Sequence, residues 1–199
     1  MSDPVEVPAR APGVRRPRRD AVENRRRLID AATTVFADRG LDAGVEEVAR
    51  TAGVGVATLY RRFPTKEALI AELVRTLVEE LLAQARQAVD VPGGRGLETH
   101  LVATGELLAA QRGCLARIWD GTGAAAARDA YWDVLDRLLA DARAAGRVRP
   151  DATREDLRLV FWSLRGVLSP VGGDPLPWRR HLGILLAGLR STEDLLPGG

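Results

Sequence analysis

The spacing of the apolar residues limits the fold more than any other feature of the 199-residue chain. From about Asp20 to Arg190 these residues recur every three or four positions, which places them on one face of a helix. The alternation of apolar and polar residues that predicts a strand is absent, and so is an internal repeat of roughly 20–50 residues. The sequence therefore predicts an all-α fold with about nine helices.

Prolines, glycines and capping residues set the expected boundaries at the N-terminus. Residues 1–19 contain four prolines and no helical period, so we expect a disordered arm. Asp20 and Glu23 form a capping-box pattern that predicts the start of the first helix. Gly40 predicts its end, because glycine is favoured just after the last helical turn.

Two short helices and a long one are expected next. The stretches "VEEVARTAG" and "VATLYRRF" predict short helices joined by a turn at Gly53. Thr65 is the expected cap of a long fourth helix, which ends before the break "VPGGRG" at residues 91–96. Beyond this break the sequence predicts further helices over residues 97–118, residues 124–145, a segment that ends at about Leu168, and Trp178 to Arg190.

The pair of short helices matches the helix-turn-helix pattern, whose second helix can lie in the major groove of DNA. The apolar residues that we expect to pack this pair against the first helix are Val48, Ala49, Val54, Leu59 and Phe63. The residues that remain on the outside of the second short helix are Val56, Ala57, Thr58, Tyr60, Arg61 and Arg62.

These outward side chains suit DNA. Arginines neutralise phosphates, and the hydroxyl groups of Thr58 and Tyr60 donate to phosphate oxygens. The only lysine, Lys66, lies in the first turn of the next helix, where a cation is unfavourable unless an anion such as a phosphate lies beside it. Methyl groups at the start of the short helix can contact thymine, and its first arginine can contact guanine.

The stretch "VEEVARTAGVGVATLYRRFPTKEALI" resembles the DNA-binding motif of the tetracycline-repressor (TetR) family of bacterial regulators. That pattern has a Gly-Val turn, Thr-Leu-Tyr on the recognition helix, an aromatic residue, and Ser/Thr-Lys-Glu at the start of the fourth helix. The matching positions here are Gly53-Val54, Thr58-Leu59-Tyr60, Phe63 and Thr65-Lys66-Glu67. The resemblance implies that Thr58, Tyr60 and Lys66 contact phosphates or base methyl groups. It also implies a DNA-binding domain over residues 20–83, with the motif at about 45–64.

Four positions depart from the family pattern. Gly44 and Gly55 stand where the family usually has Ser or Thr as N-caps, a change that costs a helix little. Arg62 replaces a frequent His, and Ala57 replaces a frequent Gly. We expect these changes to preserve DNA binding. They do not allow the operator sequence to be predicted.

The N-terminal arm is basic. Residues 1–27 contain eight arginines and four acidic residues, whereas the whole chain has a net charge of only +2. Such an arm indicates a polyanionic partner, either nucleic acid or an anionic membrane surface, or else a solubilising tail. The resemblance to the family favours entry into a minor groove, for which the candidates are Arg15, Arg16, Arg18 and Arg19.

Residues 84–199 resemble the family's regulatory domain, which implies ligand binding and dimerisation. One helix-turn-helix covers little DNA, so we expect a homodimer on a palindromic operator. Apolar stripes at residues 157–168 and 182–189, on helices that are apolar on more than one face, are expected in its interface, with ordinary core packing as the alternative. The candidate residues for a ligand pocket among the central helices are Trp119, Trp132, Trp162, Arg165 and Arg117. For each of them, packing in the core is the alternative. His100 is expected on a helix surface.

Several classes of function lack support in the sequence. No glycine-rich phosphate loop, metal-ligand spacing or nucleophile motif is present, so we expect no enzyme, cofactor or metal. The single cysteine, Cys114, fits a reducing cytoplasm, and no segment has the roughly 20 apolar residues that span a membrane. The expected function is a sequence-specific transcriptional regulator, namely a dimeric repressor released from DNA by an unknown small-molecule effector. The alternative is a non-specific architectural DNA-binding protein.

Overall fold

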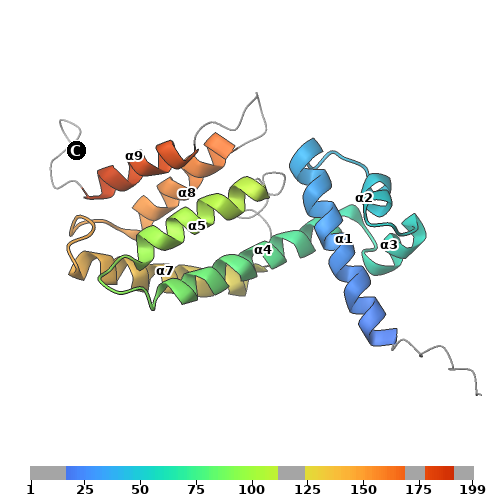
Figure 1. The fold of residues 1–199 in the computed structure, drawn as a ribbon, viewed down its shortest axis with the longest axis horizontal. Coiled ribbons are helices and arrows are strands. Elements are labelled where there is room, and N and C mark those ends of the chain that lie inside the picture. The colour runs from blue at the N-terminus through green and yellow to red at the C-terminus, as the bar shows by residue number, and fades with distance from the viewer. Residues whose placement is uncertain (1–16, 112–123, 169–177, 191–199) are drawn as a thin grey trace, which may run out of the picture.

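The computed structural model describes residues 17–111, 124–168 and 178–190, and within these ranges it contains eight helices and no strand. Figure 1 shows two helical bundles, a small one formed by the N-terminal helices and a larger one formed by the rest. The long helix α4 (Lys66–Ala88) begins in the small bundle and extends into the large one. The prediction of an all-α fold is confirmed.

The small bundle consists of α1 (Pro17–Arg39), α2 (Val45–Thr51), α3 (Val56–Arg62) and the first turns of α4. The expected start of α1 at Asp20 is wrong, because the helix begins at Pro17. Proline suits a first helical turn, since that turn needs no backbone N–H and proline fixes the required φ. The apolar residues predicted to join the helices are buried, apart from Val54, which is half-buried.

The turn between α2 and α3 has the geometry that the glycine predicts. Gly53 has φ of +67°, a left-handed conformation that favours glycine over other residues. Its N–H donates to the Arg50 carbonyl at 3.1 Å, and the Val54 N–H donates to the Ala49 carbonyl at 3.0 Å. This pair of bonds is a Schellman motif, which satisfies the last carbonyls of α2 and turns the chain toward α3.

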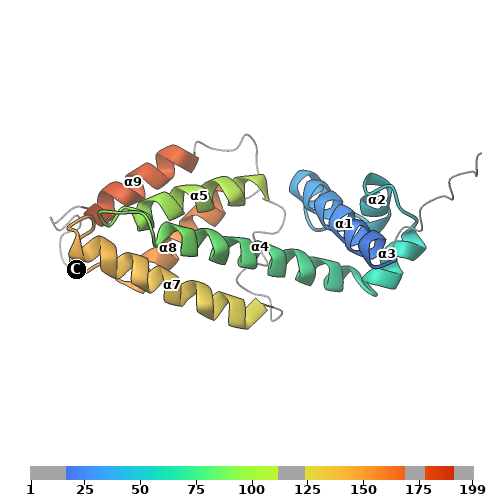
Figure 2. The ribbon, with the colours of Figure 1, turned by 60° about the horizontal axis from the view of Figure 1, so that its bottom comes forward.

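The large bundle consists of the second part of α4 and of α5 (Gly96–Ala110), α7 (Ala125–Ala144), α8 (Arg154–Leu168) and α9 (Trp178–Arg190), with α5 in contact with the other four. Figures 1 and 2 show α4, α5 and α7 side by side, with α8 and α9 against α5. Gly105 of α5 allows α9 to approach closely, because a Cβ there would lie 2.2 Å from the Trp178 ring. None of the described helices is long and apolar enough to cross a membrane.

Two expectations for the large bundle need correction. The stripes of α8 and α9 proposed for a dimer interface form part of the protomer's own core, as Leu157, Leu164, Leu182 and Leu189 are all buried. His100, expected on a surface, is 1% exposed, because α5 packs against α4, α7, α8 and α9 and leaves little of its surface to solvent. The proposed division at residue 83 stays a prediction, and α4 continues through that position without a break.

Candidate nucleic-acid interface

Helix α3 presents one anchored face and one exposed face. Leu59 is fully buried and fixes the helix on the small bundle, and Phe63 closes its C-terminal end. Elsewhere on the helix, Val56 is 36% exposed and Tyr60 43%. Ala57, Arg61 and Arg62 are exposed as well, and Thr58 is half-buried. All six residues predicted to face outward therefore lie at least partly in solvent.

The ion pairs of the small bundle separate its arginines into two groups. Glu47 accepts contacts from Arg39 at 3.1 Å and Arg50 at 3.3 Å, which ties α2 to the end of α1. Within the described part of the chain, neither Arg61 nor Arg62 forms an ion pair. The two arginines of α3 therefore remain available to an anion outside the protein.

A second ion-pair network connects α1 to α4. Glu72 of α4 contacts Arg25 of α1 and also binds Arg75 at 2.6 Å, while Arg75 also contacts Glu79. Glu72 is only 16% exposed, so this network is less screened by solvent than an ordinary surface pair. It helps to fix the orientation of the small bundle on α4, a role that the sequence analysis missed because it depends on packing between distant residues.

Lys66 opens α4 beside the small bundle. Its Nζ lies 5.9 Å from the centre of the Phe36 ring, close enough for a cation–π contact. This ring offsets part of the unfavourable interaction of the cation with the N-terminal end of the helix dipole. Thr65 forms the expected cap, as its Oγ1 accepts from the Ala68 N–H at 3.1 Å.

The basic arm is only partly described. Arg18 and Arg19 lie in the first turn of α1, whereas Arg15 and Arg16 lie outside the described residues. A helix is about 10–12 Å wide with its side chains, and the minor groove is only about 6 Å wide. The minor-groove contact predicted for Arg18 and Arg19 therefore depends on their side chains entering the groove while the helix itself stays outside it.

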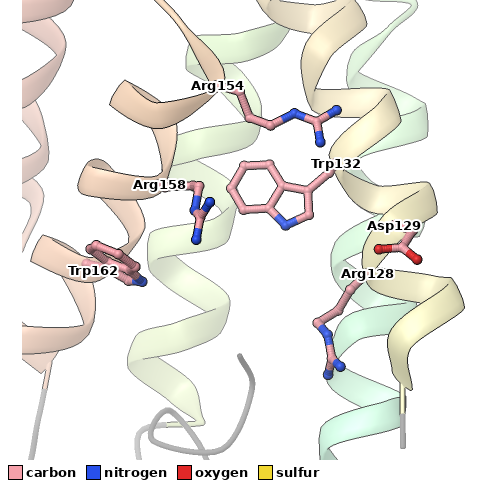
Figure 3. A pocket seen from close by; sticks show the side chains of 6 residues that line it. All are labelled: Arg128, Asp129, Trp132, Arg154, Arg158 and Trp162. Atoms are coloured by element: carbon pink, nitrogen blue, oxygen red, sulfur yellow. The ribbon is translucent and has the colours of Figure 1, made fainter. Parts of the chain in front are cut away.

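The residues predicted for a ligand pocket do not converge on one interior site. Trp132 of α7 and Trp162 of α8 line a surface cleft of about 260 Å³ between these two helices (Figure 3). Arg165 does not line it, and Arg117 and Trp119 lie outside the described residues. The cleft also contains residues that the sequence analysis did not single out: Arg128, Asp129, Arg154 and Arg158.

A buried polar cluster lies in the core of the large bundle. Nε2 of His100 is 2.9 Å from the Tyr131 hydroxyl and 3.2 Å from Oγ1 of Thr104. Burial lowers the pKa of His100 to about 4 and raises the pKa of Tyr131, because both charged forms would lose their hydration. The cluster is neutral at physiological pH. Among the described residues, no group of His, Cys, Asp and Glu side chains is arranged to hold a metal ion.

Comparison with known proteins places this geometry in a family. The model for bacterial regulatory proteins of the tetR family matches residues 28–73, from the middle of α1 to the start of α4. The crystal structure of a TetR transcriptional regulator from Streptomyces coelicolor is 32% identical, with a TM-score of 0.61, and the alignment covers 85% of this chain and 99% of that one. The chain belongs to the TetR family.

Curated relatives match this chain over about a third of its length. The repressor KstR2 of Rhodococcus jostii is 38% identical over 66 residues, which are 33% of this chain and 32% of the relative. The activator FasR of Mycolicibacterium smegmatis is 40% identical over 68 residues, which are 34% of this chain and 31% of the relative. This chain thus spans about a third of the length of these relatives. Both are named as transcriptional regulators, which supports DNA-binding transcriptional regulation as the class of function.

Proposed function

We propose that the protein is a sequence-specific, dimeric DNA-binding repressor in which α3 enters the major groove of an operator half-site. The observation that carries this proposal is the exposed surface of α3, where Tyr60, Arg61 and Arg62 lie in solvent on a helix that the buried Leu59 anchors. In this proposal the protein acts in the cytoplasm and catalyses no reaction.

The side chains of this face divide into two roles. Tyr60, Arg62, Lys66 and the half-buried Thr58 bind phosphates, which sets the position of the helix on the duplex. Val56, Ala57 and Arg61 reach base edges, where methyl groups recognise thymine and a guanidinium recognises guanine. Arg18 and Arg19 add phosphate contacts from the start of α1.

Dimerisation is supported by the outer faces of α8 and α9. Leu159 is 58% exposed, Trp162 53% and Ile184 62%, so large apolar side chains lie in solvent on both helices. A side chain at Gly166 or Gly183 would meet open space, so another helix can approach these positions. Two copies joined on this face present two α3 helices to half-sites one DNA turn apart, roughly 34–36 Å.

Release by a small-molecule effector completes the proposal. Helix α4 belongs to both bundles, so a ligand that changes the packing of the large bundle changes the position of the small one. Such a ligand needs only a few kcal/mol of preference for the conformation that does not fit DNA. The repressor role is supported by relatives such as KstR2, whereas FasR shows that activators also occur among the relatives.

The alternative of a non-specific architectural protein is tested by competition. Fragments selected from genomic DNA identify an operator, and a gel-shift assay then compares operator and random competitor at two salt concentrations. We expect the operator to compete at least a hundredfold better at physiological salt, because base contacts add to the phosphate contacts. Equal competition would disprove sequence-specific binding.

A further inference from the structure

The side-chain amine chemistry of the chain is confined to one residue. Of its 29 lysine and arginine residues, only Lys66 is a lysine. A guanidinium stays protonated at neutral pH and does not attack acyl groups, whereas a lysine amine is a common target of acylation. Acylation converts the ammonium group into a neutral amide. A donor that acylates a side-chain amine of this protein therefore acts at the start of α4, beside the proposed DNA-binding face.

The surroundings of Lys66 leave its amine free to react. Its Nζ lies 5.9 Å from the centre of the Phe36 ring, and the residue is partly exposed. Arg39 and Arg50 of the same bundle differ, because Glu47 binds them at 3.1 Å and 3.3 Å. Within the part of the chain that the structure describes, no carboxylate pairs with Lys66 in this way. An acyl donor thus has no ion pair to displace.

Acylation at this position changes the surface charge without disturbing the core. The first α4 side chain of the core is that of Leu69, three residues further along the helix. Acylation removes the cation–π contact with Phe36, but it also removes a positive charge from a helix end where a cation is unfavourable. Because these two effects oppose each other, we expect the modified protein to keep its fold.

Two neighbouring cations favour an anionic donor. Arg61 and Arg62 are the last two residues of α3, shortly before the start of α4, and both are exposed. In an acyl phosphate, a single oxygen atom joins the phosphorus to the reactive carbonyl carbon. Cations that attract the phosphates of DNA also attract this phosphate group, which brings the carbonyl carbon toward the amine. A neutral acyl donor gains no such attraction.

We propose that Lys66 is the site at which an acyl phosphate acylates this protein, and that the modification weakens DNA binding. The amine nitrogen attacks the carbonyl carbon and forms an amide bond. The carbon–oxygen bond to the phosphate breaks, inorganic phosphate leaves with the electron pair, and the nitrogen loses a proton to water. The acylation is independent of DNA recognition; only its effect on operator binding rests on the proposed function.

The acylation site is tested on the full chain with two donors of the same acetyl group, namely acetyl phosphate, an anion, and p-nitrophenyl acetate, which is neutral. Mass spectrometry of digested protein measures the rate of acetylation at Lys66 with each donor. The ratio of the two rates cancels any change in the amine itself. We expect Arg62→Gln to lower this ratio about threefold, because it removes a charge that attracts the phosphate. Arg86→Gln, an exposed position in the last turn of α4, is the matched control and should leave the ratio unchanged.

The effect on DNA binding is measured by fluorescence anisotropy with operator DNA after the donor has been removed. Treatment with acetyl phosphate should weaken operator binding by the wild-type chain about tenfold, because a charged phosphate contact is lost. Lys66→Arg keeps the positive charge but offers no amine, so its affinity should be the same before and after treatment. Both proteins retain the α-amino group, so acetylation there affects them equally.

The outcomes separate this inference from the proposed function. Equal ratios of the two rates in Arg62→Gln and Arg86→Gln would overturn acylation by an attracted acyl phosphate. An equal loss of operator affinity in treated wild-type and treated Lys66→Arg protein would overturn the effect of Lys66 acylation on DNA binding. A protein that shows the expected acetylation rates but fails the operator competition would overturn the proposed function and leave the acylation site intact.

Discussion

The outer faces of α3 and α8 both combine aromatic rings with arginines, but the electrostatic setting of the two faces differs. On α3, Arg61 and Arg62 form no ion pair within the described residues. On α8, Arg154 binds Asp136 and Arg158 binds Glu155. A face of unpaired cations suits a polyanion such as DNA, whereas carboxylates of the protein already neutralise the cations beside α8. The arrangement of carboxylates thus distinguishes two sites with similar side chains.

The largest expected effect tests the anchoring of α3. Leu59→Ala removes a fully buried side chain from a seven-residue helix, so the free energy of unfolding should fall by about 2–5 kcal/mol. Tyr60→Ala, one residue further on, changes an exposed side chain and should alter stability by less than about 0.5 kcal/mol while it weakens operator binding. Urea unfolding and gel shifts measure both. Equal loss of stability in the two variants would contradict the assignment of inner and outer faces.

A second test concerns the core of the large bundle, which lies beneath α8. His100 lies in the large bundle, and burial lowers its pKa from 6.5 to about 4. The unfolded chain therefore binds a proton below about pH 6.5 that the folded chain binds only near pH 4. Stability should fall as the pH drops through this window, by about 3 kcal/mol in total, and be unaffected by this group above it.

The control for this prediction is His100→Gln, which cannot titrate in that range. Its unfolding free energy, measured in urea at pH 7.5 and pH 5, should fall less than that of the wild type, by a difference of about 2 kcal/mol. If both proteins lose the same stability between the two pH values, His100 does not control the acid sensitivity of the large bundle.

The smallest expected effect is a change in the salt dependence of DNA binding, which differs between the arginines of α3 and α8. Arg62→Gln should reduce the slope of log affinity against log salt concentration by about 1, because one phosphate contact is lost. Arg158→Gln should leave the slope unchanged, although it removes a positive charge as well. Fluorescence anisotropy with operator DNA over a salt series measures both slopes. A similar decrease in the Arg158→Gln protein would show that general charge, rather than the α3 face, controls binding.

Local signals made the small bundle predictable. Gly53 and Thr65 mark the ends of neighbouring helices by their own backbone requirements, and the structure places α2, α3 and the start of α4 where they indicate. The start of α1 was missed because proline was interpreted only as a helix breaker, although it also suits a first helical turn.

The large bundle was less predictable, because its errors concern the number of neighbours that each helix has. The periodicity of α5 shows an apolar stripe but not that α4, α7, α8 and α9 surround it, so His100 was assigned to the surface. The cleft was predicted only in part for the same reason, since Trp132 and Trp162 were named as pocket residues but its arginines were not. The four-residue spacing of Arg154, Arg158 and Trp162 is visible in the sequence, but nothing local shows that Trp132 faces them across the gap.

Helix α4 has a mechanical consequence that follows from its length. Its 23 residues rise about 34 Å without a break, and Glu72 joins its first turns to α1. A rotation of about 5° at its far end would displace the small bundle by roughly 3 Å, since a stiff rod of that length converts angle into distance. In a symmetric dimer the displacements of the two small bundles would add. A slight rearrangement of the large bundle would then move the two α3 helices out of register with successive turns of the DNA.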